Sequence, residues 1–261
     1  MSEDDEQIET EVKRFKAVPI RFLLPNLLTL LALCSGVTAI RLAIENRLEL
    51  AVAAIIFATV LDAMDGRLAR YLDGTSKFGA ELDSLADFVN FGVAPAIMLY
   101  FWSLNSLKTF GWVICLLLPI ASALRLARFN VALDDPNKPE WTKAFFTGMP
   151  APAGALLAMA PFYIGFLTES SDGHVAARPI AAFVVLIAFL MVSRVPTFSG
   201  KTKMRVPREW VLPLLAGMAI FVVCLISFPW ETLALIASAY LLLIPVSVLS
   251  YRRRKASPTE Q

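Results

Sequence analysis

The sequence predicts an all-α, polytopic membrane protein built as a bundle of about eight transmembrane helices. Two observations indicate this fold class: 57% of the 261 residues are hydrophobic and only 18% are charged, and the mean hydropathy is +0.64. A third is the even spacing of apolar runs that are each long enough to cross a bilayer. The predicted spans are residues 23–42, 48–70, 78–102, 109–130, 151–168, 176–194, 210–228 and 231–250.

The spans divide the chain into four parts. The acidic start and the basic residues after it form a cytoplasmic tail, 1–20. Six spans in residues 21–208 form the core, because they must pack around polar groups, and two additional spans follow in 209–250. The basic tail 251–261 is typical of a membrane anchor that binds acidic lipid. The last two spans are separated only by a short corner, so seven crossings or a re-entrant segment stay open.

Basic residues gather at one end of the spans. Of the 24 Lys and Arg residues, 20 fall on the side of the N-terminus and four on the other side. The positive-inside rule then places both termini in the cytoplasm. The net charge of +2 gives no reason to expect a nucleic-acid partner.

Four carboxylates lie in apolar surroundings where acids are costly. Asp62 and Asp65 stand at i and i+3 at the end of the second span, and Asp83 and Asp87 stand at i and i+4 in the third. Each pair therefore shares one helix face. The turn-forming segment 73–77 between them should reverse the chain and bring both faces together at the cytoplasmic end. The sequence predicts that the four carboxylates converge on one pocket.

Such a cluster calls for a counter-charge, because like charges at short range do not all stay ionised alone. Oxygen-only ligands favour Mg²⁺ or Mn²⁺ over zinc, and a pair of ions is the simplest solution. Small residues beside the acids leave room for a bulky ligand, and basic ones suit its phosphates. These are Gly66, Ala69 and Gly79, and Arg67, Arg70 and Lys77.

The motif around the acids resembles the signature of the CDP-alcohol phosphatidyltransferases, D-x2-D-G-x2-A-R-x8-G-x3-D-x3-D. Eight positions match it: Asp62, Asp65, Gly66, Ala69, Arg70, Gly79, Asp83 and Asp87. The resemblance implies that the four Asp bind metal, that Asp87 is the general base, and that CMP leaves from CDP-diacylglycerol. It also implies a homodimer. The residues implied to bind CDP-diacylglycerol are Asn26, Thr29, Asp62, Gly66, Ala69, Arg70 and Gly79.

The polar residues of the segment LPNLLT before the first span have two possible roles. Asn26 could simply cap the first helix, and its spacing alone favours that role. In the resembling family a Pro-Asn-x-x-Thr segment at this place contacts the nucleotide. That resemblance favours CDP binding by Asn26 and Thr29.

Further segments are similar to the branch of this family that makes phosphatidylserine, the integral-membrane type of bacteria and archaea. The similarity covers about residues 20–210 and includes ALRLARFNV, with Arg125, Arg128 and Asn130. It implies L-serine as the acceptor, bound by these three residues, and a prokaryotic cell (inner) membrane location. Ordinary anchoring of basic side chains at a span's end is the alternative for the arginines. The branch segments FTGMPAPAGA and SRVPTFSGKTK also contain Thr147, Ser193, Ser199 and Lys201.

Other functions stay open from the residues alone. The same metal site would serve glycerol 3-phosphate, inositol phosphate or choline as the acceptor. Intramembrane carboxylates also occur in cation transporters, but here they cluster at one end instead of lining a path. Cys34, Cys115 and Cys224 match no metal spacing and are predicted to be reduced core thiols. His174 is predicted to be a solvated loop residue on the outer side, and the loop 133–150 to be either a lid or a plain connector.

Overall fold

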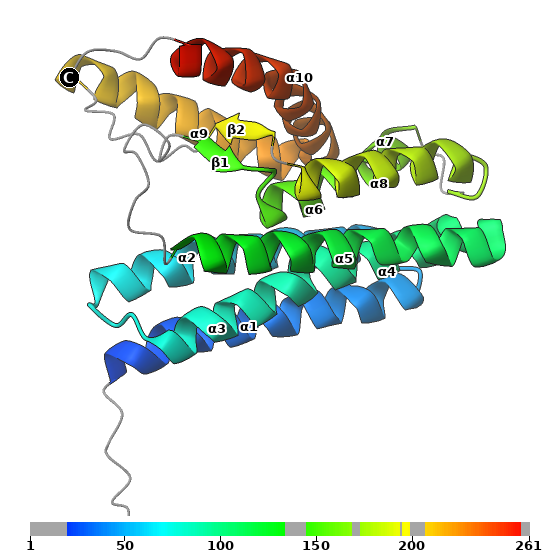
Figure 1. Ribbon diagram of the computed structural model, residues 1–261, viewed down its shortest axis with the longest axis horizontal. Coiled ribbons are helices and arrows are strands. Elements are labelled where there is room, and N and C mark those ends of the chain that lie inside the picture. Colours follow the sequence, from blue (N-terminus) through cyan, green and yellow to red (C-terminus); the bar gives the residue numbers. More distant parts are fainter. Residues whose placement is uncertain (1–19, 134–144, 169–172, 194, 199–206, 257–261) are drawn as a thin grey trace, which may run out of the picture.

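The computed structural model describes residues 20–133, 145–168, 173–193, 195–198 and 207–256. Figure 1 shows most of the helices lying side by side along the long axis, with α1 to α5 in one half and α6 to α10 in the other. The N-terminal tail, most of the 133–150 loop, Ser199 and Lys201 lie outside the described residues.

The predicted all-α fold is confirmed, with two three-residue strands as the only addition among the described residues. Strand β1 (Phe145–Thr147) pairs antiparallel with β2 (Pro196–Phe198), so that Phe146 stands opposite Thr197. The helical elements are α1 Ile20–Ile44, α2 Leu48–Tyr71, α3 Lys77–Phe88, π-helix η1 Val89–Val93, α4 Ala94–Trp102, 3₁₀ helix η2 Leu104–Leu107, α5 Lys108–Leu133, α6 Ala151–Ala158, α7 Ala160–Leu167, α8 Ala177–Val192, 3₁₀ helix η4 Arg208–Trp210, α9 Val211–Ser227 and α10 Pro229–Ala256.

Each of the eight predicted spans coincides with a helix or with a continuous run of helical segments. Four described segments are long and apolar enough to cross a membrane: Arg21–Ile44, Lys77–Trp102, Leu104–Val131 and Pro229–Ser250. Shorter apolar helices cover Ala151–Leu167, Ala177–Val192 and Val211–Ser227. Helix α2 is also long, with 24 residues, but Glu49, Asp62, Asp65, Arg67 and Arg70 give it more charged residues than such a span normally carries. The chain is therefore a polytopic helical membrane protein.

The fifth predicted span is broken near Met159, between α6 and α7. Pro161 has no amide hydrogen for the ladder, which favours a break just before it. The hydroxyl of Tyr163 donates to the carbonyl of Leu156 at 3.0 Å. A carbonyl at the break thus gains a partner, which matters because an unpaired one is costly inside a membrane.

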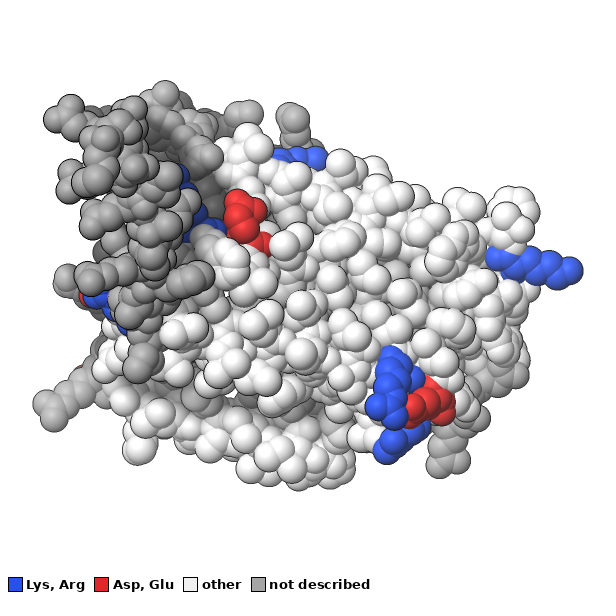
Figure 2. Space-filling model, turned by 90° about the horizontal axis from the view of Figure 1, so that it is seen from below, with Lys and Arg blue, Asp and Glu red and all other residues white. Residues whose placement is uncertain are grey.

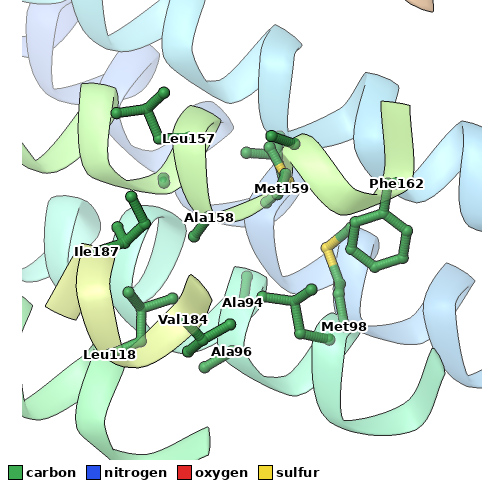
Figure 3. Packing of buried hydrophobic residues seen from close by; sticks show 14 of the residues in the cluster. Ala94, Ala96, Met98, Leu118, Leu157, Ala158, Met159, Phe162, Val184 and Ile187 are labelled. Atoms are coloured by element: carbon green, nitrogen blue, oxygen red, sulfur yellow. The ribbon is translucent and has the colours of Figure 1, made fainter. Parts of the chain in front are cut away.

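The main core is built mostly by α4, α5, α6, α7 and α8, with further buried residues from α1, α2, η1 and α10. Alanines at the helix contacts allow close approach, and larger side chains fill the space between them. Trp102 of α4 stacks on Phe162 of α7 with ring centroids 4.4 Å apart. Figure 3 shows part of this packing and labels Ala94, Ala96, Met98, Leu118, Leu157, Ala158, Met159, Phe162, Val184 and Ile187.

Large apolar side chains also cover the outside of the bundle. Helix α9 has no buried residue at all, and Leu212 on it is 77% exposed. Figure 2 shows the Lys, Arg, Asp and Glu side chains of one face in a few separate groups, with an uncharged surface between them. Such a surface suits lipid rather than water.

Candidate active site

The α2–α3 hairpin places the acids as the sequence predicts. The chain reverses at Asp73, whose φ is 49°, and the amide of Gly74 donates to the carbonyl of Ala69 at 2.9 Å. Ser76 then caps α3, because its hydroxyl accepts from the amide of Gly79 at 3.0 Å. Gly74 is required here, since a Cβ would stand 2.1 Å from the carbonyl oxygen of Arg21. The turn thus places α3 against α1.

Three of the four predicted acids meet directly. Asp62 of α2 and Asp83 and Asp87 of α3 each offer an oxygen, and these oxygens all lie within 4.8 Å of one another. The side chains of Asp62 and Asp87 are in hydrogen-bond contact. The predicted convergence therefore holds for these three residues.

Asp65 stands slightly apart from this trio. It is 4% exposed, and its Oδ2 accepts a hydrogen bond from the hydroxyl of Thr29 on α1 at 2.5 Å. Asp65 and Asp83 also line one pocket, from which Asp62 and Asp87 are absent. Asp83 is thus the carboxylate that belongs to both the trio and the pocket.

The pocket has a volume of about 400 Å³ and lies between α1 and the α2–α3 hairpin. Six residues predicted to bind CDP-diacylglycerol line it, together with two of the acids and with turn residues that sequence reasoning missed. The turn-forming segment was the available signal for Thr75 and Ser76. The lining consists of Pro25, Asn26, Thr29, Asp65, Gly66, Ala69, Arg70, Gly74, Thr75, Ser76, Gly79, Ala80 and Asp83.

Two glycines in this pocket have different physical roles. A Cβ on Gly66 would find its nearest neighbour, a guanidinium nitrogen of Arg70, 4.0 Å away. Gly66 therefore keeps open space. A Cβ on Gly79 would stand 2.8 Å from Oδ1 of Asn26 and 3.1 Å from the hydroxyl of Ser76. Gly79 therefore allows the amide of Asn26 to lie against α3, within the pocket. Helix α1 begins at Ile20, so Asn26 lies inside it, and the alternative that Asn26 caps this helix is wrong.

The three residues predicted to bind serine have different surroundings. Arg128 donates from Nη1 to the carbonyl of Val192 at 2.7 Å, at the end of α8. Asn130 donates from Nδ2 to the hydroxyl of Ser84 on α3 at 3.1 Å. Arg125 is within electrostatic range of Asp87. Arg128 and Asn130 thus hold α5 to its neighbours, and Arg125 interacts with one of the acids.

The remaining predicted residues lie away from the acids or are locally engaged. The hydroxyl of Ser193 donates to the carbonyl of Leu190 at 2.8 Å, and Thr147 belongs to β1. His174 is exposed in a loop, as predicted, with Nδ1 3.4 Å from the carbonyl oxygen of Ser103. All three cysteines are free. The prediction that they are core thiols is wrong for Cys34, which is exposed on α1.

The acid trio fits a divalent cation. Its donors are carboxylate oxygens, which suit Mg²⁺ or Mn²⁺. Oδ1 of Asp87 is shielded from solvent and has no hydrogen-bond partner among the described residues. Such an atom is costly to leave unpaired, and a cation would supply both a ligand contact and the missing counter-charge.

These features define a polytopic membrane protein with a cluster of acids that could hold a divalent cation. The family model for CDP-alcohol phosphatidyltransferase matches residues 22–193, and a second model, CDP-alcohol phosphatidyltransferase 2, matches residues 209–245. The chain belongs to the CDP-alcohol phosphatidyltransferase family, whose members are enzymes that generally depend on divalent metal.

Curated relatives agree with this assignment. The chain is 40% identical over 236 residues to the CDP-diacylglycerol–serine O-phosphatidyltransferase of Mycobacterium leprae, covering 90% of this chain and 78% of the relative. It is 34% identical over 225 residues to the protein of the same name from Helicobacter pylori, covering 85% and 89%. The archaetidylserine synthase of Methanothermobacter thermautotrophicus is 32% identical over 181 residues, covering 69% and 73%.

Proposed function

We propose that the protein transfers the phosphatidyl group of CDP-diacylglycerol to the hydroxyl of L-serine, giving phosphatidylserine and CMP. One observation carries the chemistry: three carboxylates with oxygens within 4.8 Å of one another adjoin a pocket lined by the signature residues. The names of the relatives support serine as the acceptor.

The pocket suits the nucleotide half of the donor. Asn26, Ser76 and Thr75 offer amide and hydroxyl groups to the cytidine and ribose, and Arg70 offers a guanidinium to a phosphate. Gly66 leaves room for a phosphate to approach the backbone of α2. We therefore place the CMP moiety between α1 and the hairpin.

We place the diphosphate of the donor beside Asp83, which belongs both to the acid trio and to the pocket. Asp62, Asp65, Asp83 and Asp87 would hold the ions, of which we propose two. When bound, divalent ions would neutralise the diphosphate and stabilise the departing CMP. Thr29 holds the carboxylate of Asp65 in one orientation at the edge of the pocket.

Asp87 stands one turn after Asp83 on α3, does not line the pocket and is within electrostatic range of Arg125. We therefore propose that the acceptor enters on the side of Arg125. An acceptor that enters on this side would approach the phosphorus opposite to the leaving CMP, as in-line displacement requires. A carboxyl oxygen of Asp87 takes the hydroxyl proton of serine. The serine oxygen forms the new bond to the phosphatidyl phosphorus, and the phosphoanhydride bond breaks with its electron pair on CMP.

The charge asymmetry supports a cytoplasmic site with both termini on the same side. We propose that residues 21–208 form the catalytic core in a prokaryotic cell membrane and that the chain functions as a homodimer. CDP-diacylglycerol then reaches the site from the bilayer, and serine reaches it from the cytoplasm.

The test is product identification by mass. Purified protein in detergent is supplied with CDP-diacylglycerol, Mg²⁺ or Mn²⁺ and L-serine, and in parallel with glycerol 3-phosphate, inositol phosphate or choline. We expect phosphatidylserine and an equal amount of CMP with serine only. Product with another alcohol in place of serine would refute the acceptor, and the absence of CMP release with every alcohol would refute the chemistry.

A further inference from the structure

The C-terminal helix α10 presents one face to the rest of the bundle. Trp230, Leu233, Ala237, Tyr240 and Ile244 follow one another at helical spacing and all pack against the main core. Leu233 and Ala237 are only 7% and 5% exposed. The inward position of Tyr240 therefore follows from the stripe as a whole.

An aromatic contact helps to fix this face. Trp230 packs on Phe166 of α7 with ring centroids 4.6 Å apart, and α10 also packs against β2. Helix α10 is thus part of the packed bundle. Its neighbour α9 packs chiefly against α10 and η4.

Arg125 of α5 interacts with polar groups on two other helices. Its guanidinium is within electrostatic range of both Asp87 on α3 and Tyr240 on α10. The hydroxyl oxygen of Tyr240 is itself shielded from solvent. Helices α3, α5 and α10 therefore each contribute one polar group to the same region.

The guanidinium nitrogens of Arg125 form no salt bridge within 4.0 Å and no hydrogen bond to another described residue. The guanidinium carbon lies 5.9 Å from the centroid of the Phe129 ring. Arg128, one turn further along α5, already donates to Val192. A half-buried guanidinium with free donors beside a phenol is suited to bind an anion.

We propose that Tyr240 and Arg125 together form an acceptor subsite that binds the carboxylate of a small amino acid. This inference rests on the proposed function and adds a specificity-determining residue from outside residues 21–208. The carboxylate lies between the guanidinium and the phenol, so that the hydroxyl of the amino acid points toward Asp87. An acceptor without a carboxylate gains no binding energy from the hydroxyl of Tyr240.

The test compares two single-atom variants in the full-length protein. Tyr240→Phe removes only the phenolic oxygen, and we expect the KM for L-serine to rise about 10-fold, in line with the loss of a charge-assisted hydrogen bond. The KM for CDP-diacylglycerol and the Tm should stay unchanged. Tyr100→Phe is the matched control, because Tyr100 packs edge-on against Trp112 at the other end of the α3–α4 segment.

Ethanolamine, which is serine without its carboxylate, provides a second readout. Tyr240→Phe should reduce kcat/KM for serine about 10-fold and leave kcat/KM for ethanolamine unchanged. In an Arg125→Lys background the effect of Tyr240→Phe should shrink, because both residues hold the same group.

The outcomes separate this inference from the proposed function. A normal serine KM in Tyr240→Phe, or equal losses for serine and ethanolamine, overturns the subsite and leaves serine transfer intact. Wild-type turnover with a different alcohol and none with serine overturns the proposed function, and the carboxylate subsite with it.

Discussion

Thr29 of α1 donates a hydrogen bond to Oδ2 of Asp65 on α2, with the two oxygens 2.5 Å apart. Both residues are buried, at 4% exposure each, and the same hydroxyl lies 3.2 Å from the carbonyl oxygen of Pro25. The signature hairpin is therefore joined to the first helix by a polar contact as well as by apolar packing.

Removal of this hydroxyl should weaken both the fold and the site. Thr29→Val leaves a buried carboxylate without its donor, which costs about 1–3 kcal/mol. We expect a lower Tm in detergent and a higher KM for CDP-diacylglycerol, whereas Thr29→Ser keeps both near wild type. Thr38→Val is the control, since Thr38 is exposed on the same helix and its hydroxyl donates to the Cys34 carbonyl one turn before it. Equal effects of the Val and Ser variants at position 29 would contradict this role.

Asp87→Asn should abolish proton transfer while it keeps the shape of the side chain. A carboxamide does not accept the serine proton, so we expect kcat to fall by about 10² to 10⁴. If the Asp87→Asn protein has a normal Tm and still turns over at the wild-type rate, Asp87 is not the general base. Glu81→Gln, an exposed acid of the same helix, should retain full activity.

The two pocket glycines should respond differently to alanine. Gly66→Ala meets only open space, so the fold should keep its stability or gain up to about 1 kcal/mol from helix propensity. The KM of Gly66→Ala for CDP-diacylglycerol should rise, because the added methyl group occupies space that the ligand needs. Gly79→Ala should lower the Tm as well, since its Cβ would stand 2.8 Å from Oδ1 of Asn26. Calorimetry and initial rates on both variants test this contrast, and identical behaviour would refute it.

Substitutions of the two arginines of α5, Arg125 and Arg128, should have different effects on stability and on serine binding. Arg128→Ala removes a charged donor from the end of α8 and should cost about 1.5–3 kcal/mol of stability, with the KM for serine unchanged in the folded fraction. Arg125→Lys should raise the KM for serine and leave the Tm near wild type. The reverse pattern would show that Arg128 is the acceptor residue.

Divalent cations should stabilise the fold as well as support turnover. Treatment with EDTA should abolish CMP release, and Mg²⁺ or Mn²⁺ should restore it. Because the ion binds the folded acids, a concentration of 100 times its Kd adds about 2.7 kcal/mol and raises the Tm. An Asp62→Asn, Asp83→Asn double variant should lose this Tm shift. Full activity in EDTA, with no shift in the wild type, would argue against a metal site.

The parts of the site that the sequence predicts are those close together in the chain. Asp62 and Asp87 belong to one helical hairpin, so their spacing and the turn between them are enough to bring them together. Apolar run length likewise predicts the helices, because a bilayer sets that length.

The parts that the sequence does not predict depend on contacts between distant helices. Nothing in the local sequence of Tyr240 indicates that it lies near Arg125, because that proximity follows from how α10 packs on α7. Asp65 likewise accepts its hydrogen bond from Thr29, which lies on another helix. Arg125 and Arg128 are alike in sequence, and their partners on other helices distinguish them: Val192 of α8 for Arg128, and Asp87 of α3 with Tyr240 of α10 for Arg125.

Helix α9 shows what such packing implies for variation along the chain. It has no buried side chain. The described fold therefore constrains the length and the hydrophobicity of α9 more than it constrains the identity of each residue. Exchanges among Leu, Ile, Val and Phe along α9 should accumulate freely between strains. The sequence of the adjoining α10, whose Trp230 and Ala237 pack against the main core, should vary less between strains.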